Sequence, residues 1–156
     1  MTHEHQYQAT ITWTGNRGEG TRHYRAYDRS HTIAVEGKPA IAGSSDPAFR
    51  GDSEKHNPEE MLVASLSACH MLTYLHLAAE AGVIVIAYED SAWGLMEERG
   101  IGGRFIYVVL KPIVTVAETS MIETSQRLHL QAHDNCFIAS SVNFPVDCTP
   151  KSITAC

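Results

Sequence analysis

The sequence lacks the features of several broad classes of protein. It holds 12 Lys and Arg against 18 Asp and Glu, which gives a formal net charge of -6. Nucleic-acid binding needs a basic face to neutralise phosphates, and anionic membranes attract basic segments. No apolar run approaches about 18 residues, the length that indicates a membrane span. We therefore expect no nucleic acid and no membrane among its partners.

Signals for export and for common metal or phosphate sites are also missing. Residues 1–6 have no basic start leading into an apolar stretch, so we expect no secretory signal and a cytoplasmic location, where thiols are kept reduced. No Cys-x-x-Cys pair, Gly-rich phosphate loop or Gly-x-Ser-x-Gly elbow occurs. We expect no metal and no cofactor. The four cysteines are then core thiols, ligands or redox-active groups rather than a disulfide framework.

What the sequence does contain fits one domain, residues 1–156, long enough to bury a core. Residues 7–13 alternate apolar and polar side chains, which predicts a half-buried strand, and residues 23–27 and 32–35 predict two shorter ones. Residues 37–56 have no clear period and are rich in Gly, Pro, Ser and Asp. We expect a long loop there, of the kind that is often functional, and it carries Arg50.

The best-defined helix start in the chain is at Asn57 and Pro58. Asn57 can accept from the first free N–H groups, Pro58 suits the first helical position, and Glu60 can complete a capping box. Residues 61–81 contain no Pro or Gly, and Gly82 predicts the end of the helix. Apolar side chains cover most of its circumference, which predicts a buried central helix.

The remaining segments predict strands and one further helix. Residues 83–116 form a hairpin pattern around a turn at 99–102, with Pro112 at an edge or a bulge. Ser120 and Glu123 give a second capping-box pattern, opening a helix to about residue 133. Residues 134–137 predict a short helical turn, and 146–153 a last strand interrupted by Pro150. Because strands and helices are segregated, the fold class is α+β.

Cys69 lies about three turns inside the predicted central helix, with Leu66 and Leu72 three residues away on either side. A buried cysteine is by default a small hydrophobic residue. A reactive thiol needs a nearby cation or a helix N-terminus, and the start of this helix is about 15 Å away. Arg50, on the loop before the helix, is the natural cation, although it is equally a solvated loop arginine.

Glu59 is the candidate partner for that guanidinium, through a bidentate pair. It precedes Cys69 by ten residues, about 15 Å along the helix axis, and is otherwise a plain first-turn acid. Groups that far apart share a small site only if a long arginine bridges them or if they come from different subunits. We favour the second arrangement, which makes the site a property of a dimer.

Cys136 follows Asp134 and Asn135, where the N–H groups of a short helical turn can favour its thiolate, and His133 can assist proton transfer. A structural thiol beside a satisfied histidine is the alternative. Two cysteines 67 residues apart allow a specific cycle. A peroxide oxidises one thiolate to sulfenic acid, which condenses with the second thiol to a disulfide. An external dithiol then reduces that disulfide.

Two other classes of function stay open on the residues alone. One is a non-enzymatic dimeric module for a small apolar ligand, with structural cysteines. The other is a metal-binding protein that uses His129, His133 and Cys136, since the two histidines are the only i, i+4 pair on a predicted helix. Cys148 and Cys156 are interpreted as incidental.

Four segments taken together resemble the osmotically inducible protein C and organic hydroperoxide resistance (OsmC/Ohr) family. They are Asn57-Pro58-Glu59-Glu60-Met61-Leu62, Ser67-Ala68-Cys69-His70, Cys136-Phe137-Ile138-Ala139 and Val142-Asn143-Phe144-Pro145-Val146. The order of predicted elements also matches, over nearly the whole chain. The resemblance implies antiparallel sheets wrapped around two central helices in an intertwined homodimer.

The same resemblance implies a function and a role for each site residue. The function is reduction of organic hydroperoxides, and more weakly of hydrogen peroxide, in oxidative stress defence. Cys69 is the peroxidatic thiol, Cys136 resolves it, and Glu59 positions an arginine. Arg50 fits the OsmC-like branch of the family.

Three N-terminal arginines, Arg17, Arg22 and Arg25, fit the alternative arrangement found in the family. The apolar helix face around Leu66 and Leu72 is expected to accept the alkyl tail of the peroxide. The implied reductant is a lipoylated protein or another external dithiol. Cys148 and Cys156 lie outside the family pattern and leave room for a side disulfide.

Overall fold

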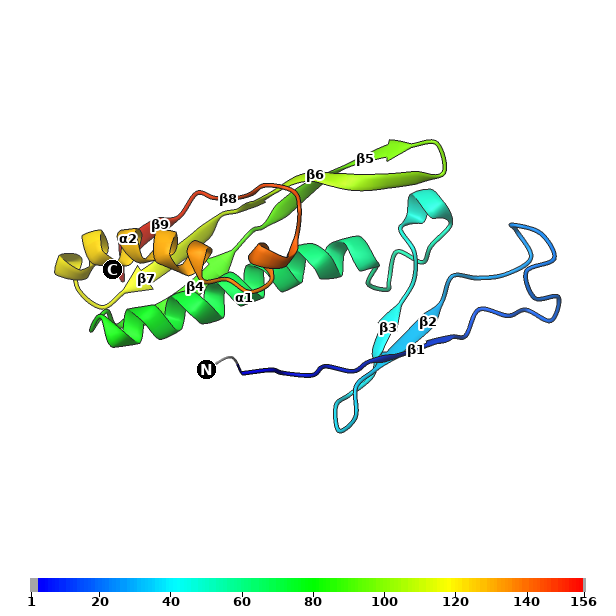
Figure 1. Ribbon diagram of the computed structural model, residues 1–156, viewed down its shortest axis with the longest axis horizontal. Helices are drawn as coiled ribbons and strands as arrows, with labels where there is room; N and C mark the ends of the chain where they lie inside the picture. The colour runs from blue at the N-terminus through cyan, green and yellow to red at the C-terminus, as the bar shows by residue number, and fades with distance from the viewer. Residues whose placement is uncertain (1–2, 156) are drawn as a thin grey trace. The chain divides into compact units, whose positions relative to one another are not determined.

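The computed structural model describes residues 3–155 and divides into two compact units, Met1–Met61 and Leu62–Cys156, each of which is described by itself. Figure 1 labels the elements along the chain. The assignment of residues 1–156 to one domain stays a prediction.

The first unit contains a small antiparallel sheet in the order β1-β2-β3. Its strands are β1 (Thr10–Trp13), β2 (His31–Ala34) and β3 (Ile41–Gly43). The strand expected over residues 7–13 is present as β1, but all four of its side chains are exposed rather than alternately buried. In the single chain, no second layer covers the apolar side of this strand.

Two expectations for this unit were wrong. Residues 23–27 form turns rather than a strand, with an isolated bridge between Asn16 and Tyr27. The segment 37–56, expected to be a loop throughout, contains β3 and a 3-10 helix, η1 (Pro47–Phe49). A three-residue strand is too short to show a period in the sequence, and its pairing with β2 stabilises it.

The second unit is built on two successive three-stranded sheets. Their orders are β4-β7-β9 and β5-β6-β8, from β4 (Val85–Asp90), β5 (Trp93–Arg99), β6 (Gly102–Leu110), β7 (Pro112–Val116), β8 (Val146–Cys148) and β9 (Lys151–Thr154). The predicted hairpin is confirmed: β5 pairs with β6, and β4 with β7, both antiparallel. The last strand pairs in parallel with β6 and β7, in two pieces separated by Pro150.

Pro112 does not occupy the edge or bulge that the sequence predicted. It is the first residue of β7, the central strand of its sheet, opposite Asp90. The first position of a strand tolerates the missing N–H of proline. The break between β6 and β7 falls at Lys111, directly before it.

The helix start at Asn57 is confirmed in atomic detail. Helix α1 (Pro58–Glu80) begins with a capping box: the Glu60 N–H donates to Asn57 Oδ1 over 2.8 Å, and the Asn57 N–H donates to Glu60 Oε2 over 3.2 Å. Gly82, just past its end, has a φ of 71°, a left-handed conformation that glycine adopts without strain.

Burial along α1 is one-sided, which corrects the expectation of an all-round buried helix. One stripe is buried, namely Leu66, His70, Tyr74 and Ala78. Another stripe, formed by Ala64, Ala68, Leu72 and His76, is exposed in the single chain. By length and composition α1 is apolar enough to cross a membrane, which is weak evidence by itself. The packing of its buried stripe is that of a core helix.

The second helix, α2 (Ile122–Asp134), follows a 3-10 turn, η2 (Thr119–Met121), and a third 3-10 turn, η3 (Ala139–Ser141), comes after it. Helix α2 is confirmed, but its predicted capping box does not form. Ser120 Oγ donates to Glu118 instead, and the helix continues directly from η2.

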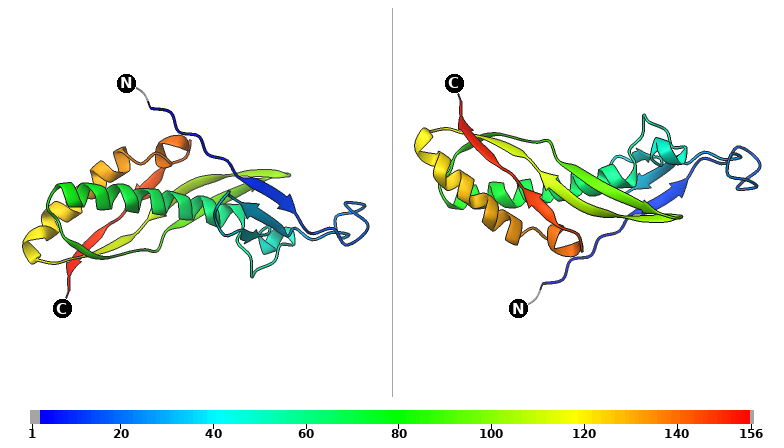
Figure 2. Two further views of the ribbon diagram at one scale, coloured as in Figure 1. Left: turned by 90° about the horizontal axis from the view of Figure 1, so that it is seen from below. Right: turned by 90° about the horizontal axis from the view of Figure 1, so that it is seen from above.

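Both helices of the second unit lie against one face of its strands, as Figure 2 shows. The core between them has two parts. One contains Tyr74, Val114, Val116 and Leu128, and the other contains Leu66, Val108, Leu110 and Val146. The α+β class is confirmed, and these two layers position the residues of the site.

Candidate functional site

The structure brings the thiols of Cys69 and Cys136 together within the second unit. Cys69 is half-buried on α1, and Cys136, 1% exposed, lies in the segment after α2. Burial first, and then the neighbouring Cys69 thiol, raise the pKa of Cys136 to about 11. Two cysteines 67 residues apart in the sequence therefore face each other across one small site.

The backbone around Cys136 forms the short helical turn expected from the sequence. The Cys136 N–H donates to the His133 carbonyl over 3.2 Å, and the Cys136 carbonyl accepts from the Ser140 N–H over 3.0 Å. The backbone N–H groups of Ile138 and Ala139 do favour the thiolate, as predicted. Burial and the Cys69 thiol outweigh them, so Cys136 is held as a protonated thiol near neutral pH.

The two leucines predicted to accept a substrate tail occupy different surroundings. Leu66 is fully buried and packs in the core with Val108, Leu110 and Val146. Leu72 is 63% exposed. The Leu66 side chain is covered by the chain's own core, and its assignment to a substrate surface stays a prediction. The exposure of Leu72 is compatible with the predicted contact with a substrate tail, which stays a prediction.

Arg50, in the first unit, has a distinctive backbone. It ends η1, where Asp46 Oδ1 accepts from the Ala48 N–H over 2.7 Å and the Arg50 N–H donates to the Pro47 carbonyl over 3.0 Å. These bonds hold Arg50 at a φ of 65°, and among residues 3–155 no other non-glycine residue has a positive φ. Left-handed backbone at a non-glycine residue is uncommon and gathers at functional sites.

Two of the three N-terminal arginines, Arg17 and Arg22, are engaged within their own turn. The Arg17 guanidinium donates to the carbonyls of Arg25 and Ala26 and lies 3.8 Å from Asp28. The Arg22 guanidinium lies 4.0 Å from Glu19. Among the described residues of the first unit, no hydrogen bond or ion pair holds the guanidinium of Arg50 or that of Arg25, and Arg50 lines an open cavity of about 330 Å³. Both arginines therefore stay available as cations.

Glu59 lies in the first turn of α1, and its Oε2 is buried with no hydrogen-bond partner among the described residues. Buried polar atoms are usually paired, so this carboxylate lacks a donor such as a guanidinium. Arg50 and Glu59 belong to the first unit, whereas the two cysteines belong to the second. The joint site of these four residues stays a prediction.

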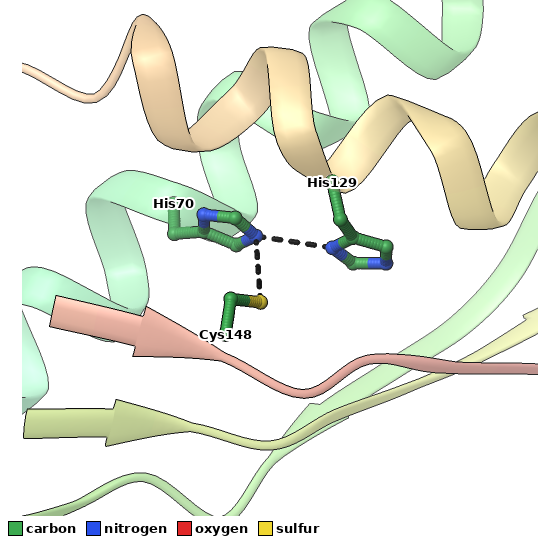
Figure 3. Close-up of side chains that lie close together, drawn as sticks. All are labelled: His70, His129 and Cys148. Atoms are coloured by element: carbon green, nitrogen blue, oxygen red, sulfur yellow. Dashed lines mark hydrogen bonds between the residues drawn. The ribbon is translucent and has the colours of Figure 1, made fainter.

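A second group of reactive side chains lies in the core of the second unit and was missed in the sequence. His70 Nε2 lies 3.0 Å from His129 Nδ1 and 3.6 Å from Cys148 Sγ (Figure 3). Burial, and then the charge of His133, lower the pKa of His70, and burial lowers the pKa of His129 to about 4. Burial and the Asp90 carboxylate raise the pKa of Cys148 to about 12.

The signal for this group in the sequence was weak, because its members come from three separate elements. The alternative metal set of His129, His133 and Cys136 is not what the structure gathers. Cys136 faces Cys69, and His129 is grouped with His70 and Cys148 instead.

Comparison with known proteins places this geometry in a family. The sequence model of the OsmC-like protein family matches residues 51–151. An OsmC-like protein of unknown function from Vibrio cholerae has a similar structure, with a TM-score of 0.85, 32% identity, and coverage of 94% of this chain and 99% of that one. No curated protein sequence matches the chain significantly.

Two more distant structures share the fold. An organic hydroperoxide resistance protein from Elizabethkingia anophelis is 18% identical with a TM-score of 0.73, and covers 98% of this chain and 100% of its own. The organic hydroperoxide resistance protein OsmC from Legionella pneumophila is 15% identical with a TM-score of 0.70, and covers 99% and 100%. The match over residues 51–151 includes Cys69, Cys136 and the Asn57 helix start. This chain belongs to the OsmC-like family.

Proposed function

We propose that the protein is a thiol-dependent peroxidase that reduces organic hydroperoxides, and more weakly hydrogen peroxide, in oxidative stress defence. The observation that carries the proposal is the adjacency of the Cys69 and Cys136 thiols inside one folded unit. A pair of adjacent reduced thiols is what a sulfenic acid needs in order to be resolved as a disulfide. Two relatives of the same fold are organic hydroperoxide resistance proteins, which supports this substrate class.

The different surroundings of the two thiols assign their roles in the proposed cycle. Cys69 is half-buried and can be reached by a peroxide, whereas Cys136 is 1% exposed. A thiolate next to a second thiolate is disfavoured by repulsion, so the site ionises one sulfur at a time. The raised pKa of Cys136 makes it the sulfur that stays protonated. Cys69 is accordingly the nucleophile, and Cys136 the resolving thiol.

The proposed cycle has three balanced steps. The Cys69 thiolate attacks the O–O bond of ROOH, takes up one oxygen as sulfenic acid and releases the alcohol ROH after protonation. The Cys136 sulfur then attacks the sulfenic sulfur, forming the Cys69–Cys136 disulfide and releasing water. An external dithiol, on a lipoylated protein or a small molecule, reduces the disulfide by thiol exchange and is itself oxidised.

In this proposal Arg50 and Glu59 orient the peroxide. Glu59 offers a buried carboxylate oxygen without a partner, and Arg50 offers a guanidinium that its own unit leaves free. A bidentate arginine–carboxylate pair would fix the guanidinium, whose positive charge favours a thiolate and a peroxide oxygen.

The proposed active form is an intertwined homodimer in the cytoplasm. The exposed apolar side of α1, with Ala64, Ala68 and Leu72, offers a surface that a second copy can cover. The four exposed residues of β1 offer another. A cytoplasmic location suits the cycle because its thiols must be reduced before each turnover.

Stopped-flow mixing of the reduced protein with cumene hydroperoxide tests the proposal. We expect rapid stoichiometric loss of peroxide and a Cys69–Cys136 disulfide in mass spectra. Cys69→Ser should abolish the fast reaction, whereas Cys136→Ser should consume one equivalent and stop at the oxidised Cys69. Cys156→Ser, which removes a thiol outside the proposed site, is the matched control and should behave as the wild type.

The opposite result would be a reaction no faster than that of a free thiol, or an unaffected Cys69→Ser variant. Either outcome would refute the peroxidase and favour a dimeric module that binds a small apolar ligand.

A further inference from the structure

The cluster of His70, His129 and Cys148 has the composition of a metal site. Its ligand atoms come from α1, α2 and β8, and all lie within 4.8 Å of one another (Figure 3). His70 is 1% exposed and His129 is 2% exposed, so both rings are fixed in the core. Two imidazoles and one thiol are the side chains that zinc sites use most.

Two of the three distances between ligand atoms are close to those of one tetrahedral ion, and the third, from His129 to Cys148, is at most 4.8 Å. With bonds of about 2.05 Å to nitrogen and 2.3 Å to sulfur, tetrahedral Zn²⁺ holds two nitrogen ligands about 3.3 Å apart and a nitrogen and a sulfur about 3.6 Å apart. The observed distance between His70 Nε2 and Cys148 Sγ is 3.6 Å. The two facing ring nitrogens are 3.0 Å apart, so the rings would need to separate by only about 0.3 Å to accept the ion.

We propose that His70, His129 and Cys148 bind one thiophilic first-row dication, for which Zn²⁺ is the best fit. Imidazole and thiolate together favour Zn²⁺ over the hard ions Mg²⁺ and Ca²⁺, which take oxygen ligands. The site is separate from the Cys69–Cys136 pair and uses none of the residues of the proposed peroxidase cycle.

The ring nitrogens of the cluster are only partly paired. Two hydrogen bonds join His70 Nε2 to His129 Nδ1 and to Cys148 Sγ, whereas the ring nitrogens that face away from the proposed ion, His70 Nδ1 and His129 Nε2, are buried with no partner among the described residues. Buried polar groups are usually paired. Burial keeps both rings neutral near pH 7, which is the form in which histidine binds metals. An ion would pair both inward nitrogens and the sulfur at once.

The Asp90 carboxylate favours a cation at this position, whereas the charge of His133 opposes one. Asp90 lies close enough for its carboxylate to act on His70 and Cys148, and it is held by Ser67 Oγ and the Lys111 N–H at 2.6 Å each. A dication would displace the Cys148 proton to solvent and balance two negative charges, the new thiolate and the Asp90 carboxylate.

An open cavity of about 400 Å³ gives solvent access to the cluster. Its lining includes His129 and Cys148, together with His133 and Asp147. A metal ion can enter by this route. The fourth position of a tetrahedral ion can be filled by a water molecule in this cavity or by one of the polar side chains that line it.

Titration of the reduced full-length protein with Co²⁺ tests the proposal directly. We expect one Co²⁺ per chain, with a thiolate-to-cobalt charge-transfer band in the near ultraviolet and the visible bands of tetrahedral cobalt. Zn²⁺ should bleach both. Cys148→Ser should remove the charge-transfer band, and His129→Gln should weaken binding by at least about tenfold. Cys156→Ser is the matched thiol control and should keep the full spectrum.

Three outcomes would overturn the proposal. One is the absence of a charge-transfer band in the folded wild type. Another is a band that survives in Cys148→Ser but disappears in Cys69→Ser or Cys136→Ser, which would place the ion on the redox pair. If Cys148→Ser does not fold, the melting temperature of the wild type tests whether the site binds the ion. It should rise with Zn²⁺ and fall with a chelator, and no change would contradict the site.

Discussion

Replacing Leu66 by Ala separates a core role from a substrate-binding role for this residue. Leu66 is 0% exposed and packs among Val108, Leu110 and Val146, so truncation leaves a cavity. Core Leu→Ala changes lower the free energy of unfolding by about 2–5 kcal/mol. Leu130, on α2, is 72% exposed, so Leu130→Ala should change it by no more than about 0.5 kcal/mol.

The two variants make the same chemical change on a helix, so their difference isolates burial. Urea denaturation followed by circular dichroism, at one protein concentration, gives both free energies. Equal values for the two variants, or a difference below about 1 kcal/mol, would refute the core assignment. A Leu66→Ala protein of normal stability with a raised KM for bulky hydroperoxides would support the predicted substrate role.

The remaining predictions concern titration, assembly and capping. The pKa of Cys136 in the folded protein is raised to about 11, so its contribution to stability is fully present below the pKa of the unfolded chain and is lost as the pH rises toward 11. The melting temperature should therefore fall over this pH range, and it should fall less in Cys136→Ala. Leu72→Asp, on the exposed stripe of α1, should convert a homodimer to monomers in light scattering, and an unchanged mass would exclude that stripe from the interface. Asn57→Ala removes the cap of α1 and should cost about 1 kcal/mol in denaturation, whereas a neutral effect would show that the capping box is dispensable.

Local features of the fold could be predicted from the sequence because their causes are local. The capping box at Asn57 and the stop at Gly82 depend on neighbouring residues, and both are present. The hairpin of β5 and β6 follows from two β-branched runs around a Gly-rich turn. The strand β3 escaped notice because three residues show no period, and its stability comes from pairing with β2.

Features that depend on the tertiary fold could not be read in the same way. The apolar circumference of α1 predicted burial on every side, but the strands of this chain cover one stripe only. The position of Cys69 as a candidate nucleophile came from a motif, whereas its adjacency to Cys136 needed the fold. His70 and Cys148 carried no spacing signal, because residues from three elements meet only when both helices pack on the strands.

In the proposed cycle, the separation of Cys69 and Cys136 in the sequence would tie the lifetime of the protein to its redox state. A disulfide between them would close a loop of 67 residues and restrict the unfolded chain, which corresponds to about 4 kcal/mol of stabilisation. The reduced form would then open far more often than the oxidised one. Proteases act on opened chains, so the molecules ready to react with peroxide would be those most easily degraded, and oxidation would protect them until a dithiol returned them to the reduced pool.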